Sequence, residues 1–169
     1  AQALAEANGY RAELIAGEEP ELCVRLRAAG WRIWRLGNEM TLHDAAMTRF
    51  GQWWKRSKRA GYAFGEGVRL HGAPPERHYV PHARRALVWG ILLPAATVLL
   101  SLTNNLFLTL LLAYPAQVVR LVAKGKLTGR TAWWRAIFLV LGRFPEAHGL
   151  ISFYYHRGIG RRGVLIEYK

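Results

Sequence analysis

The sequence predicts a mainly α-helical protein. The end of an α/β domain (a helix, a strand and a long basic helix) comes first, followed by a transmembrane helical hairpin and an interfacial helix. Three observations predict this class: residues 1–85 have the mixed charge of soluble protein, residues 86–119 contain no charged side chain, and aromatic and basic side chains are mixed after residue 130. The predicted parts are therefore residues 1–72, 84–124 and 130–169.

The soluble part contains three predicted elements. A helix is expected over residues 20–29, because Pro20 suits the first helical position and Gly30 suits the position just after a helix end. The segment WRIWRL, residues 31–36, alternates as a strand does and carries large apolar groups on both sides. A strand covered on two faces is typical of an α/β sheet. A long basic helix is then expected from about Thr48 to Leu70.

The uncharged segment is too apolar for an amphipathic helix of a soluble protein. As one helix, its roughly 34 residues would run about 50 Å, against a hydrocarbon core of about 30 Å. A turn at Thr103–Asn105 divides it into two short spans, about 86–102 and 106–122. A hairpin buried inside a large soluble core is the alternative.

Four cations, Arg84, Arg85, Arg120 and Lys124, lie at the outer ends of these two spans. The positive-inside rule therefore predicts that both flanking segments are cytoplasmic. The formal net charge of +13 favours an anionic partner. Membrane lipids fit this charge, and we expect no nucleic acid, since the chain has no recognised nucleic-acid motif. The single cysteine, Cys23, is consistent with a reducing compartment.

After the hairpin, residues 131–156 combine aromatic side chains with arginines, which is typical of headgroup depth. This segment is predicted either to lie on the membrane or to cross it as a third, shallow span, with Pro145 breaking it in two. The basic tail that follows is either solvated or held on anionic lipid.

Two acidic side chains, Glu18 and Glu19, precede the first predicted helix. The helix dipole and its free N–H groups favour negative charge at this position. Capping alone would therefore explain the pair, and a catalytic role depends on the surrounding motif.

The segment NGYRAELIAGEEPELCVRLRAAGWRIWRL resembles the acceptor-side segment of family 2 glycosyltransferases of the GT-A type. The residues that carry the resemblance are Asn8, Gly9, Tyr10, Gly17, Glu18, Glu19, Glu21, Leu22, Arg25, Leu26, Gly30, Trp31 and Ile33. It spans about residues 3–70 and extends loosely to the hairpin, since many membrane-attached members carry one. The resemblance implies that Glu19 takes the proton of the acceptor hydroxyl. Glu18 takes this role instead if the motif is aligned one residue earlier.

The resemblance also implies roles downstream. His43 would complete a site for Mn²⁺ or Mg²⁺, with an ordinary loop histidine as the alternative. Gln52 and Trp53 would contact the acceptor, and Arg56 and Arg59 would bind substrate phosphate, with lipid headgroups as the alternative ligand. Processive members have Gln-x-x-Arg-Trp here, whereas this chain reads QWWKR, which favours transfer of a single sugar.

The implied function is that of part of an inverting glycosyltransferase at the bacterial inner membrane. It would move a sugar from a nucleotide sugar to a lipid-linked, membrane-associated or polysaccharide acceptor. The sequence contains no Asp-x-Asp motif, and Asp44 is its only aspartate. We therefore expect the C-terminal portion of a transferase, with the donor-binding half elsewhere or on a complementary chain. The alternative is a non-catalytic membrane anchor or assembly subunit.

Overall fold

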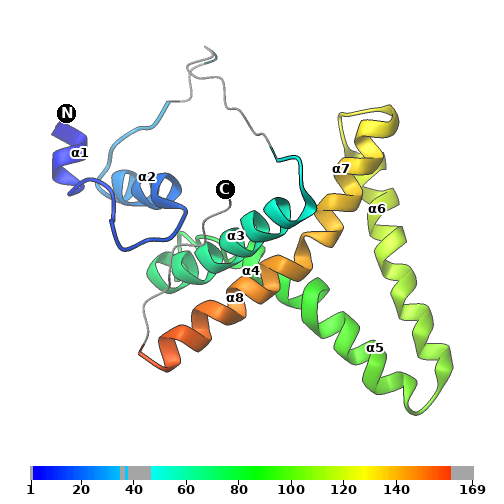
Figure 1. Cartoon of the computed structure of the whole chain (residues 1–169). Coiled ribbons are helices and arrows are strands. Elements are labelled where there is room, and N and C mark those ends of the chain that lie inside the picture. Colours follow the sequence, from blue (N-terminus) through cyan, green and yellow to red (C-terminus); the bar gives the residue numbers. More distant parts are fainter. Residues whose placement is uncertain (1, 35–36, 38–46, 161–169) are drawn as a thin grey trace.

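A computed structural model describes residues 2–34, 37 and 47–160, of which 74% are helical, with no strand among them (Figure 1). The mainly helical class is thereby confirmed. The elements are α1 (Gln2–Glu6), α2 (Glu18–Ala28), α3 (Phe50–His71), α4 (Val80–Leu87), the π-helical turn η1 (Val88–Leu92), α5 (Leu93–Ser101), the 3-10 helix η2 (Asn105–Leu112), α6 (Ala113–Lys124), α7 (Gly129–Leu141) and α8 (Arg143–Gly158).

The strand expected over residues 31–36 is not present at residues 31–34, and residues 35 and 36 lie outside the described part of the chain. A strand needs a neighbour for its backbone N–H and C=O groups, and no described segment forms one. The side chains point to the same conclusion. Trp34 is 79% exposed, and the Trp31 indole Nε1 donates to Glu6 at 2.9 Å. The alternating pattern therefore marks an extended segment with no sheet to cover it.

Helix α2 begins two residues earlier than expected and ends at Ala28, one residue before the expected end, with Gly30 just beyond it. It starts at Glu18, so Pro20 is its third residue rather than its first. Proline is tolerated there because the N–H groups of the first turn have no intrahelical partner. At the other end Gly30 adopts φ +85°. The Gly30 N–H donates to Arg27 O and the Trp31 N–H to Leu26 O, both at 3.0 Å. These bonds form a Schellman cap.

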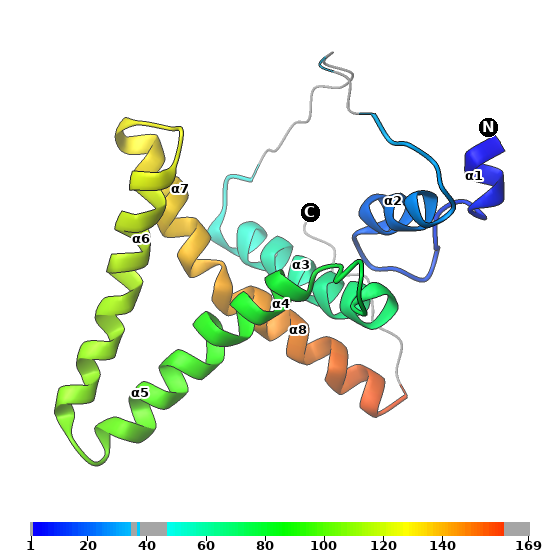
Figure 2. The same cartoon turned by 180° about the vertical axis from the view of Figure 1, so that it is seen from behind.

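Helices α3, α4 and α8 pack into a compact unit, which we call the platform (Figures 1 and 2). Each helix contributes one residue to its main cluster: Phe64 from α3, Ala83 from α4 and Leu150 from α8. All three are buried, and Leu150 is only 1% exposed. Apolar burial of this kind, at about 25 cal/mol per Å², is what holds the three helices together.

Helices α3 and α8 cross at very short range. A Cβ added to Gly61 would lie 1.9 Å from the backbone oxygen of Glu146, and one added to Gly149 would lie 1.9 Å from that of Lys58. Only glycine allows the two backbones to approach this closely, as small residues do where helices pack in membranes.

Three helical segments are long and apolar enough to span a membrane: Val80–Ser101, Asn105–Lys124 and Gly129–Gly158. The first two are separated by residues 102–104 and diverge from there in both views (Figures 1 and 2). In their most apolar windows only 17% and 0% of the residues are buried. Their apolar surface is therefore not covered by the rest of the described chain, which argues against a hairpin buried in its own core and indicates a membrane protein.

The third segment breaks at a different residue from the one expected. Helix α7 ends at Leu141 and α8 begins at Arg143, so the break falls at Gly142 and not at Pro145. Pro145 occupies the third position of α8, where its missing N–H is not needed.

Candidate functional site

The first turn of α2 presents the two predicted catalytic carboxylates. Gly17 precedes the helix with φ +84°, a left-handed conformation that favours glycine. Glu18, the first helical residue, is half-buried, whereas Glu19 is exposed. Neither carboxylate forms a hydrogen bond or ion pair within the described ranges. Glu19 is therefore accessible to a solute.

Glu21, in the same turn, is buried and surrounded by cations. It is 1% exposed. It accepts from Arg11 Nε at 2.8 Å, from Arg25 Nε at 2.9 Å and from His71 Nε2 at 2.9 Å. Burial alone would raise the pKa of Glu21, but the hydrogen bonds from Arg25 and His71 and the charges of Arg25 and Arg11 outweigh it and lower the pKa below its usual range. Glu21 is thus a structural anchor that is ionised at neutral pH.

Arg25 joins this anchor to the turn that follows α1. Its guanidinium donates to the backbone oxygens of Ala7 and Gly9, in addition to Glu21. Asn8 and Gly9 both have positive φ, 55° and 62°, so the chain reverses sharply there. The Asn8–Gly9–Tyr10 part of the motif and its Glu21–Arg25 part are therefore joined by direct hydrogen bonds.

Ile15 fixes the loop before α2 to the platform. It is 5% exposed and packs with Tyr62 and Phe153. Its backbone oxygen accepts from Arg59 Nε at 2.8 Å, and its N–H donates to Glu66 at 3.3 Å. One buried side chain and two backbone hydrogen bonds thus place α2 over α3.

Among the described acids outside the apolar segments, Glu66 has the pKa that departs most from its ordinary value. Burial raises its pKa to about 7. The nearby Glu18 carboxylate adds to this shift, whereas the hydrogen bond from Ile15 opposes it. Glycines on both sides of Glu66 permit close packing: a Cβ on Gly65 or Gly67 would lie 2.5 Å from the ring of Phe153 or Tyr79. These contacts desolvate the carboxylate.

Two of the predicted substrate residues have structural contacts at the start of α3. The Gln52 side-chain oxygen accepts the N–H groups of Thr48 and Arg49 at 3.1 and 3.0 Å and so caps the helix. The Trp53 ring meets the Phe138 ring of α7 edge-on, with centroids 5.1 Å apart. Their use in binding an acceptor remains a prediction.

The predicted phosphate ligands differ in their surroundings. Arg56 is exposed and lies 3.9 Å from the Met47 sulfur, whereas Arg59 holds the Ile15 carbonyl. His43 lies outside the described residues. Within residues 2–34, 37 and 47–160, no three His, Cys, Asp or Glu side chains gather as a metal site. The expected Mn²⁺ or Mg²⁺ remains a prediction.

Sequence reasoning did not single out Glu21 or Glu66. Glu21 matched the motif, but nothing local distinguished it from its exposed neighbours. A signal existed for Glu66, which is an acid between two glycines, GEG, in an otherwise basic helix. Such spacing favours close helix contact around a carboxylate.

In comparisons with known proteins, no family model, no curated protein and no solved structure matches this chain. Nothing in these comparisons identifies a glycosyltransferase family, so the resemblance depends on the motif residues alone. The established features are a mainly helical chain and three candidate membrane spans.

Proposed function

We propose that this chain is the membrane-attached, acceptor-side part of an inverting glycosyltransferase. One observation supports it above all: the acidic motif is divided between two roles. Glu21 is buried and fully paired, whereas Glu19, two residues earlier, is exposed at the helix start. A helix N-terminus favours negative charge, and an exposed carboxylate can come within hydrogen-bond reach of an acceptor hydroxyl, as a general base must.

In the proposed reaction the acceptor hydroxyl gives its proton to Glu19 while its oxygen attacks the anomeric carbon of the donor sugar. The bond from that carbon to the nucleotide diphosphate breaks in the same step, which inverts the configuration. Glu18 is the neighbouring candidate for the base, and Arg56 is an exposed cation for the departing phosphate. The donor and its divalent ion would be held by the donor-binding half of the transferase, which lies elsewhere or on a complementary chain.

The acceptor is expected at the cytoplasmic face of a bacterial inner membrane. The three apolar helices support a membrane location, and the cations at the outer ends of the first two support the cytoplasmic face. The bacterial inner membrane is implied by the glycosyltransferase resemblance. A lipid-linked or polysaccharide acceptor could then reach α2, which is fixed to the platform through Ile15.

The test is sugar transfer in membranes that carry the natural protein at its full native length, with labelled nucleotide sugars and Mn²⁺. Glu19→Gln should lower kcat by about 10²–10⁴-fold, the usual contribution of a general base. Glu18→Gln tests whether Glu18, and not Glu19, is the general base. Glu76→Gln, which alters an exposed acid outside α2, is the control. Full turnover in both α2 variants would overturn the assignment and favour the alternative of a non-catalytic anchor or assembly subunit.

A further inference from the structure

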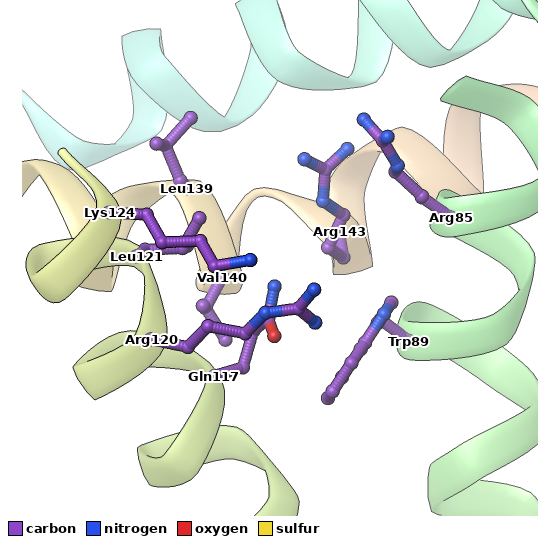
Figure 3. A pocket seen from close by; sticks show the side chains of 9 residues that line it. All are labelled: Arg85, Trp89, Gln117, Arg120, Leu121, Lys124, Leu139, Val140 and Arg143. Carbon is purple, nitrogen blue, oxygen red and sulfur yellow. The ribbon is translucent and has the colours of Figure 1, made fainter. Parts of the chain in front are cut away.

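A cavity of about 330 Å³ lies between the outer ends of the apolar helices, far along the chain from α2. It is bounded by α4 and η1 on one side, by α6 on another, and by α7 and α8 (Figure 3). Its polar lining consists of Arg85, Gln117, Arg120, Lys124 and Arg143.

The cations of this cavity lie in two pairs along its edges. In Figure 3 the nitrogen-bearing ends of Arg120 and Lys124 face one space beside the Gln117 amide, and the guanidinium groups of Arg85 and Arg143 lie together at another edge of the cavity. These residues come from α4, α6 and α8, so only the packing of the helices brings them together.

This positive charge is poorly compensated. Among the described residues that line the cavity there is no carboxylate, and Arg143 is paired with Glu146 at 2.7 Å. Within the described ranges, Arg85, Arg120 and Lys124 form no ion pair. Like charges held together at the edge of a low-dielectric region repel one another, so an anion between them would be bound favourably.

The remaining walls are apolar and belong to the candidate spans. They are formed by Trp89, Leu121, Leu139 and Val140. Trp89 also contacts Tyr114, whose hydroxyl donates to the Trp89 backbone oxygen at 2.6 Å. A cationic space above apolar helix surface, at the ends of spans, matches the depth of lipid headgroups.

We propose that this cavity binds a phosphate or diphosphate group, carried by a lipid headgroup or free in solution. Arginine forks and a lysine are the side chains that recognise phosphate oxygens. The volume is at the low end of the roughly 300–1,000 Å³ of small-molecule sites. It therefore suits a phosphate group better than a whole nucleotide sugar. This proposal does not depend on the proposed function, since it concerns binding without sugar transfer.

The test is calorimetric titration of the full chain in uncharged detergent, at about 0.15 M salt, where exposed charges are well screened. The probes are dihexanoyl phosphatidic acid and inorganic pyrophosphate. Arg120→Gln/Lys124→Gln should weaken binding of the effective probe by about tenfold or more, because hydrogen bonds to charged groups are lost. Both residues are exposed, so the fold should persist.

The matched control is Arg84→Gln/Lys126→Gln, which removes the same charge from exposed positions near the ends of the apolar helices but outside the lining of the cavity. Its affinity should stay within about twofold of the unaltered chain. Tight binding of the lipid alone supports a headgroup source, and equal binding of pyrophosphate supports a soluble one. An equal loss in both double variants, or no binding of either probe, would overturn the proposal.

Discussion

Glu19 and Glu21 are two positions apart, and the pitch of the helix turns them toward different surroundings. At 3.6 residues per turn, two positions correspond to about 200° around the axis. Glu21 therefore faces Arg11, Arg25 and His71, while Glu19 faces solvent. This rotation makes Glu21 an anchor and leaves Glu19 available for chemistry.

Glu66 should make stability depend on pH. Its pKa is about 7 when folded, against an ordinary value of 4.5. The folded chain therefore holds this proton more tightly than the unfolded chain, and the free energy of unfolding falls as pH rises from 4.5 to about 7. In Glu66→Gln that fall should be smaller, because the neutral amide oxygen can still accept the Ile15 N–H.

The measurement for Glu66 is thermal unfolding in detergent at about pH 5 and about pH 8, which together span most of this window. Glu76→Gln, an exposed acid, should keep the pH dependence of the unaltered chain. An identical pH dependence in Glu66→Gln and the unaltered chain would show that the carboxyl is not held protonated by its surroundings.

At the scale of elements, the α3–α8 crossing is the contact on which the rest of the fold depends. It positions Tyr62 and Phe153 around Ile15, and Ile15 in turn holds the loop that leads to α2. The same two helices also place Glu66 where burial raises its pKa. The position of Glu19, the candidate base, thus depends on Gly61 of α3 and Gly149 of α8, which allow these two helices to cross closely.

Gly61→Ala should destabilise the chain strongly. Its new Cβ would lie 1.9 Å from the backbone oxygen of Glu146, and a backbone cannot yield as a flexible side chain can. Overpacking in a core typically costs about 1–3 kcal/mol, and this contact belongs at the upper end or beyond. Thermal or denaturant unfolding followed by circular dichroism would measure it.

Gly51→Ala is the matched control, since it lies in the same helix and a Cβ there meets nothing within 4 Å. It should be neutral or stabilise the helix by up to about 1 kcal/mol, because alanine is the better helix former. Equal stability of the Gly61 and Gly51 variants would contradict the close crossing.

At the scale of the whole molecule, the apolar helix Val80–Ser101 leaves the platform, to which its first part, α4, belongs, and diverges from the helix Asn105–Lys124 (Figure 2). The platform buries its own apolar groups, whereas the helices Val80–Ser101 and Asn105–Lys124 expose theirs. In water this exposure would be costly, at about 25 cal/mol per Å² of apolar surface. A lipid environment removes that cost, so these helices are expected to cross the membrane.

Topology can be tested with single cysteines. In a Cys23→Ser background, Asn104→Cys should react with a membrane-impermeant maleimide added to intact cells. Where the cells have an outer membrane, that membrane is first made permeable to the reagent. Lys126→Cys should react only after the inner membrane is opened. The reason is the positive-inside rule, applied to the cations at the outer ends of the two helices. Labelling of both positions from the same side would contradict a hairpin that crosses the membrane.

The sequence by itself determined several features, because each depends on neighbours along the chain. The uncharged segment 86–119 predicted apolar helices, since hydropathy is a local property. Gly30 predicted the end of α2, since its conformational freedom is intrinsic. The strand predicted for residues 31–36 is absent at residues 31–34. Alternation of side chains is a local property, but a strand also requires a neighbouring strand for its backbone hydrogen bonds.

Only the tertiary structure decided which residues meet. From the sequence, Arg85, Arg120 and Lys124 were cations at the ends of spans. Packing of α4, α6 and α8 adds Arg143 and encloses a cavity between them. In the same way, burial distinguished Glu21 and Glu66 from the exposed Glu19. Charge and residue type are written in the sequence, whereas proximity and desolvation arise only when distant helices pack against one another.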